Sequence, residues 1–173
     1  MTHKEKILTI ASDLSLEPIF KFIPFSQSRH KNSKIKYLNW EVTLLRNKNP
    51  ILTIDYSMGI AYCPSYKNSR TMYVVERINK EIECGFKVVG EHFMAPTKNQ
   101  ILPEFADVLH CIIIDSTAIN YPTFEEWADS FGYETDSISA EKIYKQCLET
   151  GLKIRAAIGE SGLQRLLEAC ENY

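Results

Sequence analysis

The sequence contains none of the short motifs that identify common enzyme sites. It has no GxGxxG or GxxxxGK[ST], the glycine-rich segments that hold phosphates, and no GxSxG nucleophile turn. The four histidines stand in no recognisable catalytic motif; they are His3, His30, His92 and His110. We therefore expect a protein that is not an enzyme and has no catalytic residues.

Long apolar segments are missing as well. The longest run, Val108 to Ile114, is interrupted by His110 and is far shorter than the roughly 20 residues that span a bilayer. At the N-terminus, Lys4, Glu5 and Lys6 precede only a brief apolar patch, which is not an adequate signal-peptide core. These features predict a cytoplasmic protein without a membrane partner.

Cysteine pairs with metal-site or disulfide spacing are also absent. The five cysteines are an odd number, and no two of them form a CxxC pair. Cys63, Cys84, His92 and His110 are spaced in a way that matches no standard zinc pattern. We expect reduced thiols, no metal and no cofactor, with His110 as a histidine of the core or its boundary.

Positive charge is scarce in the second part of the chain. The protein as a whole has a net charge of −2, but residues 1–100 hold fifteen Lys and Arg against nine Asp and Glu, a net of +6. Residues 101–173 hold five against thirteen, a net of −8. Such asymmetry indicates a nucleic-acid-facing surface, an acidic interaction surface, or two halves that attract each other.

The basic half is predicted to be mainly β-structure with one helix. Residues 17–25 suit an edge strand, since they contain two prolines, and residues 37–46 alternate with Leu38, Trp40, Val42 and Leu44 on one face. A turn at 47–50 leads into a hairpin partner at 51–56, and a loop follows at 57–67. Residues 70–84 have the apolar spacing of a helix, residues 86–94 resemble a short strand, and 96–103 form a linker.

The acidic half is predicted to be entirely helical. Pro103 suits the first position of a helix that runs to about Asp115. Thr123 and Glu126 have capping-box spacing, and Gly132 ends the helix that they open. A longer helix spans about 139–158 with Ile143, Cys147, Ile154 and Ile158 inward; after Gly159, Ser161 and Gln164 open a last helix.

These elements predict an α+β fold, with an N-terminal antiparallel sheet and a C-terminal bundle of four helices. The sheet contains the hairpin at about 37–57. We expect one compact domain, made of the basic segment 1–100 and the acidic segment 101–173, with disorder only at 1–6 and in the polar stretch 26–36.

The acidic half contains a candidate protein-binding surface. Carboxylates on rigid helices can engage a basic partner, and tyrosines nearby are typical of interface anchors. The alternative is a solvated helical face. The candidate residues are Glu125, Glu126, Asp129, Tyr133, Glu134 and Asp136.

The basic half supports two alternatives. A positively charged loop beside the hairpin could hold a nucleic-acid backbone, although a solvated loop is the plainer interpretation and Trp40 alternates with core positions. The residues of this nucleic-acid hypothesis are Arg29, Lys31, Lys34, Lys36, Arg46 and Lys48. A thiol-dependent enzyme built around Cys63, which lies in a loop rich in Gly, Pro and Tyr, is the other alternative.

Two segments carry a family resemblance. The first comprises DYSMG at 55–59 and CPSYK at 63–67; the second comprises YPTFEEWA at 121–128, FGY at 131–133, AE at 140–141, IY at 143–144, CLE at 147–149 and RAA at 155–157. Together they resemble a family of small uncharacterised proteins encoded by bacteriophages and prophages of Gram-negative bacteria. The resemblance covers roughly residues 38–67 and 101–173.

The resemblance indicates a biological context for the protein but no catalytic chemistry. Small phage proteins of this kind often bind host machinery, and anti-CRISPR or other anti-defence inhibitors are one common class. The resemblance assigns no catalytic residue. It favours a phage protein in the bacterial cytoplasm that binds and inhibits a host or CRISPR-type nucleoprotein through its acidic helices.

Overall fold

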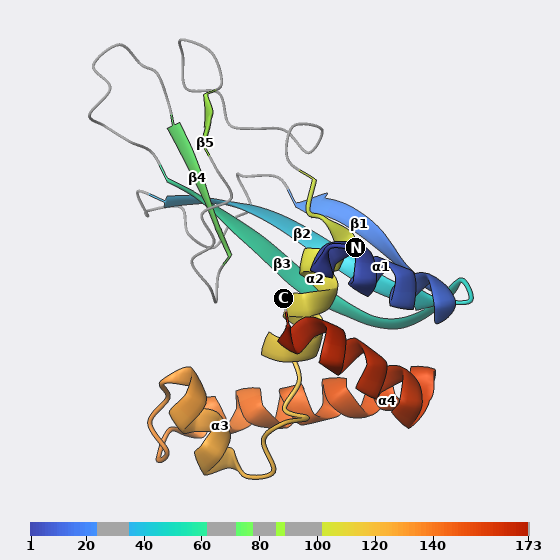
Figure 1. Cartoon of the computed structure of the whole chain (residues 1–173). Coiled ribbons are helices and arrows are strands. Elements are labelled where there is room, and N and C mark those ends of the chain that lie inside the picture. Colours follow the sequence, from blue (N-terminus) through green and yellow to red (C-terminus); the bar gives the residue numbers. More distant parts are fainter. Residues whose placement is uncertain (24–34, 62–71, 78–85, 89–101, 173) are drawn as a thin grey trace. The chain divides into compact units, whose positions relative to one another are not determined.

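The fold is α+β, as the sequence predicts. The computed structural model describes residues 1–23, 35–61, 72–77, 86–88 and 102–172. An antiparallel sheet lies in the N-terminal half and helices make up the C-terminal part (Figure 1). The chain forms two compact units. Unit 1 comprises residues 1–18, 44–52 and 104–173, and unit 2 comprises residues 19–43 and 53–103.

The strands follow one another in the sheet in chain order. They are β1 (Leu16–Ile23), β2 (Ile35–Arg46), β3 (Asn49–Ala61), β4 (Met72–Arg77) and β5 (Phe86–Val88). The prediction of an edge strand at 17–25 is confirmed over 17–23, because β1 pairs only with β2 among the described strands; residues 24–25 lie outside the described part. An edge position accommodates Pro18, which has no N–H to donate to a neighbour.

The hairpin between β2 and β3 is confirmed, with a turn of only two residues. Asn47 and Lys48 both have positive φ, 49° and 65°. Two consecutive left-handed residues make the turn whose twist matches that of paired strands, and Asn is among the residues that adopt this conformation most easily. The strand resumes at Asn49, two residues earlier than expected, and β3 continues to Ala61, so the loop predicted from Ser57 is wrong over 57–61.

The helix predicted over 70–84 is wrong where the structure describes it. Residues 72–77 form β4, which pairs antiparallel with β3 at Gly59↔Glu76 and with β5 at Tyr73↔Lys87. Tyr, Val and Val in succession favour a pleated strand over a helix, and this preference outweighs a loose helical spacing. The strand expected at 86–94 is confirmed over 86–88; the remainder of both segments lies outside the described residues.

Unit 2 is organised around Trp40, whose side chain is buried as predicted. Phe20 and Phe22, two residues apart on β1, meet the indole edge-on at centroid distances of 6.2 and 5.1 Å. The opposite face of these strands is more exposed: Lys21 pairs there with Glu41 at 3.2 Å, and Ile19 on the same face of β1 is also exposed. This alternation is typical of a sheet with one buried face.

Unit 1 begins with a helix where the sequence predicts disorder. The expectation of disorder at residues 1–6 is wrong, because α1 (His3–Asp13) starts there with a full capping box. Glu5 N donates to Thr2 Oγ1 at 3.2 Å, and Thr2 N donates to Glu5 Oε2 at 2.6 Å. These two bonds satisfy backbone donors that would otherwise lack partners at a helix start.

The first helix of the acidic half ends in a wider turn. After the cap residue Glu104, α2 (Phe105–His110) runs into a π-helical turn, η2 (Cys111–Asp115). The predicted end at Asp115 is confirmed, whereas the start lies two residues after Pro103. His110 is buried, as expected of a core histidine. Lys4 of α1 bonds Glu104 at 2.6 Å and Asp107 at 3.2 Å, and so ties α1 to α2.

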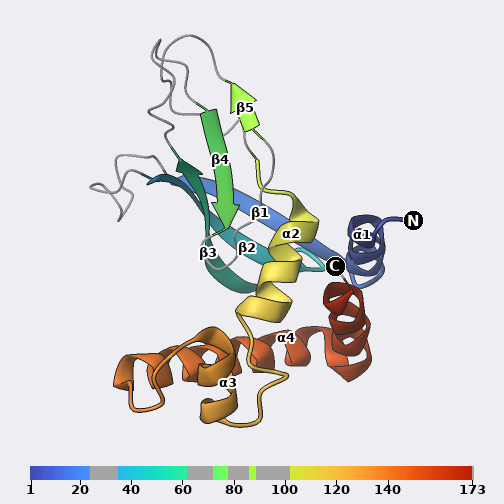
Figure 2. The same ribbon diagram turned by 60° about the vertical axis from the view of Figure 1, so that its left-hand side comes forward.

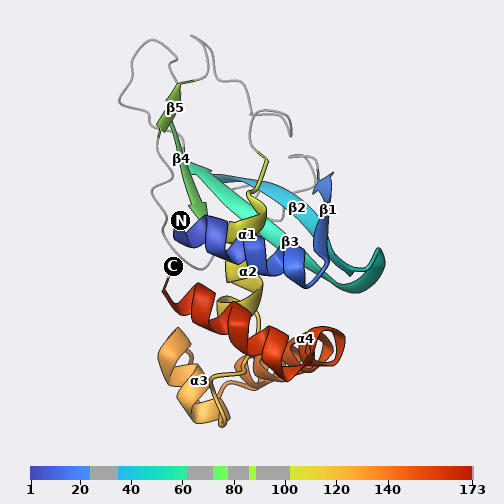
Figure 3. The same ribbon diagram turned by 45° about the vertical axis from the view of Figure 1, so that its right-hand side comes forward.

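The last two predicted helices form one element with a sharp bend. In α4 (Ile138–Glu171), Gly159 has φ 75° and ψ 168°, which divides the helix into two arms at the predicted break (Figure 2). The second arm lies beside α1, and Arg165 bonds Asp13 at 2.7 Å (Figure 3). Cys147, Ile154 and Ile158 are buried as predicted, but Ile143 is 37% exposed, so its predicted inward position is wrong.

Candidate protein-binding surface

The candidate surface is built on α3 (Phe124–Phe131), a short helix fixed at both ends. Thr123 Oγ1 accepts a hydrogen bond from Glu126 N at 3.2 Å, as the capping-box spacing predicts. At the other end Gly132 is left-handed, with φ 72°, and its N–H bonds back to the last turn. Glycine is suited to this position because it has no Cβ to strain the left-handed backbone.

An aromatic cluster lies beneath this helix. Trp127 is 2% exposed and lies among the rings of Phe124, Phe131 and Tyr144, with centroid distances of 5.3 to 6.2 Å. Tyr144 comes from the first arm of α4, and its hydroxyl donates to Tyr121 O at 3.0 Å. Such contacts hold α3 rigidly against α4, since each aromatic pair adds about 0.5–1.5 kcal/mol to the energy of burial.

Tyr133 is the solvent-exposed residue of this aromatic cluster. Its ring stacks on Trp127 with an interplanar angle of 8° and a centroid distance of 5.0 Å, while 41% of the residue stays exposed. The Tyr133 N–H also donates to Ala128 O at 2.8 Å. An exposed ring held in this way can contact a partner with little further loss of conformational entropy.

Five carboxylates share the exposed side of this segment. We define the acidic–aromatic surface as Tyr133 together with Glu125, Glu126, Asp129, Glu134 and Asp136, all of which are exposed. No Lys or Arg occurs in the sequence between Lys98 and Lys142. Among the described residues none of the five carboxylates forms an ion pair, whereas Glu141, Glu149 and Glu160 each have a cationic partner.

The negative charge of this surface affects the ionisation of Tyr144 in the aromatic cluster. The pKa of Tyr144 is raised above its ordinary value, first by burial and then by the charges of Glu125 and Glu126. A neighbouring negative charge disfavours a second one, so the phenol is held protonated. The surface therefore presents a negative field and an exposed ring on a rigid support.

The residues of the nucleic-acid hypothesis are only partly described. Arg29, Lys31 and Lys34 lie outside the described residues, and Lys36 is in β2. Lys48 is exposed at the hairpin turn, whereas Arg46 is half-buried and lines a cavity beside α4. Arg46 is therefore less accessible to a nucleic-acid backbone than Lys48 is.

The alternative of a thiol-dependent enzyme at Cys63 stays a prediction, because Cys63 lies outside the described residues. Cys147 and Cys170 are free thiols in the described part, and Cys111 Sγ donates to Asp115 Oδ2 at 3.4 Å. Burial raises the pKa of Cys147, and burial together with Glu171 raises that of Cys170 to about 12. Thiols shifted in this direction are poor nucleophiles. Within the described ranges, no group of His, Cys, Asp and Glu side chains could hold a metal ion.

Two features of the structure have no clear signal in the sequence. The stacking of Tyr133 on Trp127 depends on the turn at Gly132, and only the Trp-x-x-x-Phe-Gly-Tyr order hints at it. The cavity at Arg46 joins residues more than 100 positions apart, for which the sequence carries no local signal.

Comparison with protein-family models, curated proteins and solved structures gives no match to this chain. In the part of the chain that the structure describes, no helix combines the length and the apolar character needed to cross a membrane. Function is therefore inferred from the residues and their geometry.

Proposed function

We propose that the protein is a non-enzymatic, phage-encoded inhibitor that binds a host defence nucleoprotein, of the anti-CRISPR type, through the acidic–aromatic surface. One observation carries the proposal: five exposed carboxylates on α3 and the turn after it, without ion pairs in the described part, accompany the exposed Tyr133, which stacks on the buried Trp127. The resemblance of 121–157 to phage proteins supports the same context.

The chemistry of this surface fits a basic partner. A nucleoprotein binds its nucleic acid in a positively charged channel, and a surface that carries several negative charges without internal compensation is complementary to it. Because the five carboxylates have no cationic partner among the described residues, they lose no ion pair on binding. Tyr133 supplies the aromatic anchor that charged residues alone lack.

Charge reversal tests the proposal. The triple variant Glu126→Lys, Asp129→Lys, Glu134→Lys changes three exposed side chains and leaves the aromatic cluster intact. We expect it to lose binding to a purified CRISPR effector–guide RNA complex in a polarisation or interferometry assay, and to lose protection of phage in a plaque assay. The physical reason is that attraction to the basic channel becomes repulsion.

A matched control carries the same change of net charge elsewhere. Glu149→Lys, Glu160→Lys, Glu168→Lys also reverses three exposed carboxylates, all of them on α4. This control should retain binding, and its thermal unfolding should be compared with that of the test variant. Equal binding by both variants at moderate salt would contradict the assignment of the acidic–aromatic surface.

A further inference from the structure

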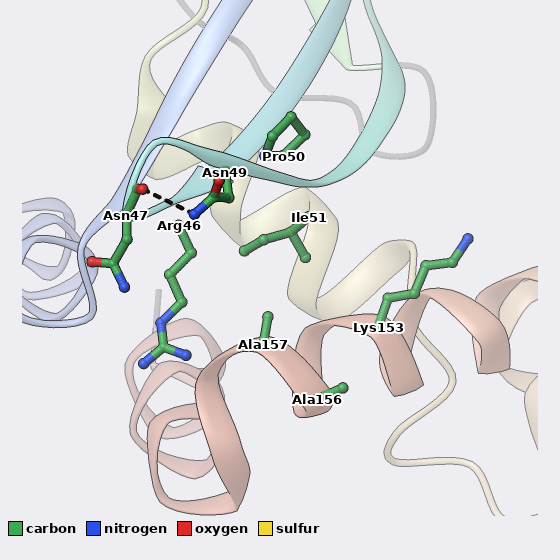
Figure 4. A pocket seen from close by; sticks show the side chains of 8 residues that line it. All are labelled: Arg46, Asn47, Asn49, Pro50, Ile51, Lys153, Ala156 and Ala157. Carbon is green, nitrogen blue, oxygen red and sulfur yellow. Dashed lines mark hydrogen bonds between the residues drawn. The ribbon is translucent and has the colours of Figure 1, made fainter.

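A cavity within unit 1 has the opposite character to the acidic–aromatic surface. It has a volume of about 490 Å³ and lies between the β2–β3 hairpin and the first arm of α4. It is open to solvent, since Lys153 and Ala156 on its lining are exposed, and its size is sufficient for a small organic molecule. No acidic side chain lines it; its lining residues are Arg46, Asn47, Asn49, Pro50, Ile51, Lys153, Ala156 and Ala157 (Figure 4).

Arg46 is the polar group of this cavity that most needs a partner. Its side chain extends from the end of β2 toward α4, and the Nε atom is buried without a hydrogen-bond acceptor among the described residues (Figure 4). A buried guanidinium nitrogen without an acceptor is costly, and because Nε itself is covered, a ligand in the cavity would meet Arg46 through its Nη groups. Among possible acceptors, an oxyanion matches the fixed fork of guanidinium donors best.

The remainder of the lining is mainly apolar. Ala156 and Ala157 form one side on α4, and Ile51 extends toward them from β3, whereas the Pro50 ring lies on the other side of this strand (Figure 4). The alanines leave room for a ligand because they project only a methyl group. A bare inorganic ion would leave these apolar groups in contact with water, whereas an organic body would cover them.

The hairpin turn and Lys153 complete the lining. Asn49 Nδ2 donates to Asn47 O at 3.2 Å, which fixes this amide beside the cavity and leaves its oxygen as an acceptor for a ligand hydroxyl. Lys153 lies on the far side of the two alanines from Arg46 (Figure 4). Its ammonium pairs with Glu149 at 2.9 Å, but both groups are more than half exposed, and exposed pairs of this kind contribute at most about 1 kcal/mol.

We infer that this cavity binds a small organic molecule with an oxyanion at one end, a carboxylate or a phosphate, and an apolar body. The oxyanion accepts hydrogen bonds from Arg46, and the body lies across Ala156 and Ala157 against Ile51. Lys153 adds a second positive charge at the rim. This site is independent of the proposed inhibitor function, since it shares no residue with the acidic–aromatic surface.

Four small probes separate the contributions of charge and apolar contact. Phenyl phosphate and phenylacetate carry both an anion and an apolar ring, benzyl alcohol carries the ring without charge, and inorganic phosphate carries charge without the ring. In ligand-observed NMR titrations of the full chain, we expect saturable binding of the first two and at least about tenfold weaker binding of the others. The ratio between phenyl phosphate and phenylacetate then identifies the preferred oxyanion.

Variants assign the binding to the cavity. Arg46→Gln should weaken phenyl phosphate binding about tenfold or more, because one charged hydrogen-bonding partner is lost. Ala156→Leu should weaken binding of the apolar ring by narrowing the cavity, while keeping a good helix former at an exposed position. Lys145→Met is the matched control on the same helix; this residue pairs with Glu141 and does not line the cavity. If Arg46→Gln fails to fold, Ala156→Leu and Lys153→Met still provide the test.

Each other result overturns the inference. Equal binding of benzyl alcohol would show an apolar crevice only, and equal binding of inorganic phosphate would show an adventitious ion only. Absence of saturable binding by both charged probes at millimolar concentration would remove the site. Tighter binding of a short oligonucleotide than of phenyl phosphate, lost in Arg46→Gln, would assign Arg46 to nucleic acid instead.

Discussion

Tyr133 combines two properties that rarely occur together in one side chain. Its ring is 41% exposed, yet it is held in one orientation by stacking on the buried Trp127. A free aromatic side chain would lose rotamer entropy on binding, and this one has already lost it on folding. At the scale of single residues, Tyr133 is therefore the position where the proposed binding should be most sensitive to truncation.

Tyr133→Ala tests this directly. We expect binding of the CRISPR effector complex to weaken at least tenfold, because aromatic anchors at the centre of an interface commonly contribute about 2 kcal/mol or more. The free energy of unfolding should fall by about 1–3 kcal/mol, from the loss of the stacked pair and of the buried part of the ring. Tyr133→Phe keeps the ring and should stay close to wild type. Unchanged binding by the alanine variant would exclude Tyr133 from the interface.

Cys170 predicts a pH dependence of stability. Its pKa is raised by burial to about 12, compared with 9.0 in a free thiol. The unfolded chain therefore loses this proton at lower pH than the folded protein does. The stabilisation is fully present below pH 9 and is lost as the pH rises toward 12, at up to about 1.4 kcal/mol per pH unit.

The measurement is urea unfolding at several pH values between about 7.5 and 10.5, a range that brackets the unfolded-state pKa. Cys170→Ala removes the titrating group, so its free energy of unfolding should fall less steeply above about pH 9 than that of the wild type. The constant cost of the lost sulfur cancels in this comparison of slopes. Tyr144, whose pKa is also raised, contributes with the same sign in both proteins. Equal slopes would show that Cys170 does not titrate as inferred.

Two glycines interrupt the helices with different backbone conformations. Gly132 ends α3 with φ 72° and ψ 30°, whereas Gly159 divides α4 with φ 75° and ψ 168°. The first pair of angles is the left-handed helical conformation, which Asn also adopts. The second lies in a region that is essentially restricted to glycine. At either site a Cβ would meet no neighbouring atom within 4 Å, so only the backbone conformation distinguishes the two positions.

This difference gives a matched pair of substitutions. Gly159→Asn should lower the free energy of unfolding by about 1–3 kcal/mol, and Gly132→Asn by about 1 kcal/mol or less. Chemical denaturation of both variants under one set of conditions checks the expectation. A larger loss at Gly132 than at Gly159 would show that the bend in α4 is not held in the described conformation.

The elements that the sequence could predict are those with strong local signals. The β2–β3 hairpin has strict alternation and a turn-forming Asn47-Lys48 pair, and α3 has a cap at Thr123 and a glycine stop at Gly132. Two other elements lack such signals. The buried face of α1 has only Ile7, Ile10 and Ala11, so its short polar sequence resembles a tail. In β4 the helical spacing of apolar residues is misleading, because pairing with β3 and β5 decides its conformation.

The candidate surface likewise has features that the sequence predicts and features that it does not. That the carboxylates of α3 are exposed follows from the apolar stripe on its other face, so the sequence alone places them in solvent. The stack between Trp127 and Tyr133 and the unpaired buried nitrogen of Arg46 depend on contacts between separate elements of the described structure. No periodicity encodes such contacts.

At the scale of the whole molecule, the charge asymmetry separates the proposed function from its nucleic-acid alternative. Neutralising Lys31, Lys34 and Lys36 removes three of the fifteen cations of residues 1–100 and leaves the acidic–aromatic surface unchanged. If the protein is an inhibitor that binds through its acidic helices, this variant should bind the effector complex as the wild type does.

A salt series with labelled single-stranded DNA completes the test. Binding by a basic loop weakens linearly in log–log form as salt increases, with a slope of about 0.7 for each phosphate neutralised. We expect no measurable DNA affinity of the wild type at about 0.1 M salt. A steep salt dependence that disappears in the triple lysine variant would support the nucleic-acid alternative.

The arrangement of unit 1 along the chain has a consequence for synthesis. Its residues come from 1–18, 44–52 and 104–173, and the bond between Asp13 and Arg165 joins positions 152 residues apart. At roughly 5–20 residues per second, the ribosome makes α4 about 8–30 s after α1. Until then the apolar face of α1 lacks this contact, so unit 1 can complete its folding only after α4 has been synthesised. A stalled or truncated chain would accordingly leave this face exposed to chaperones and proteases.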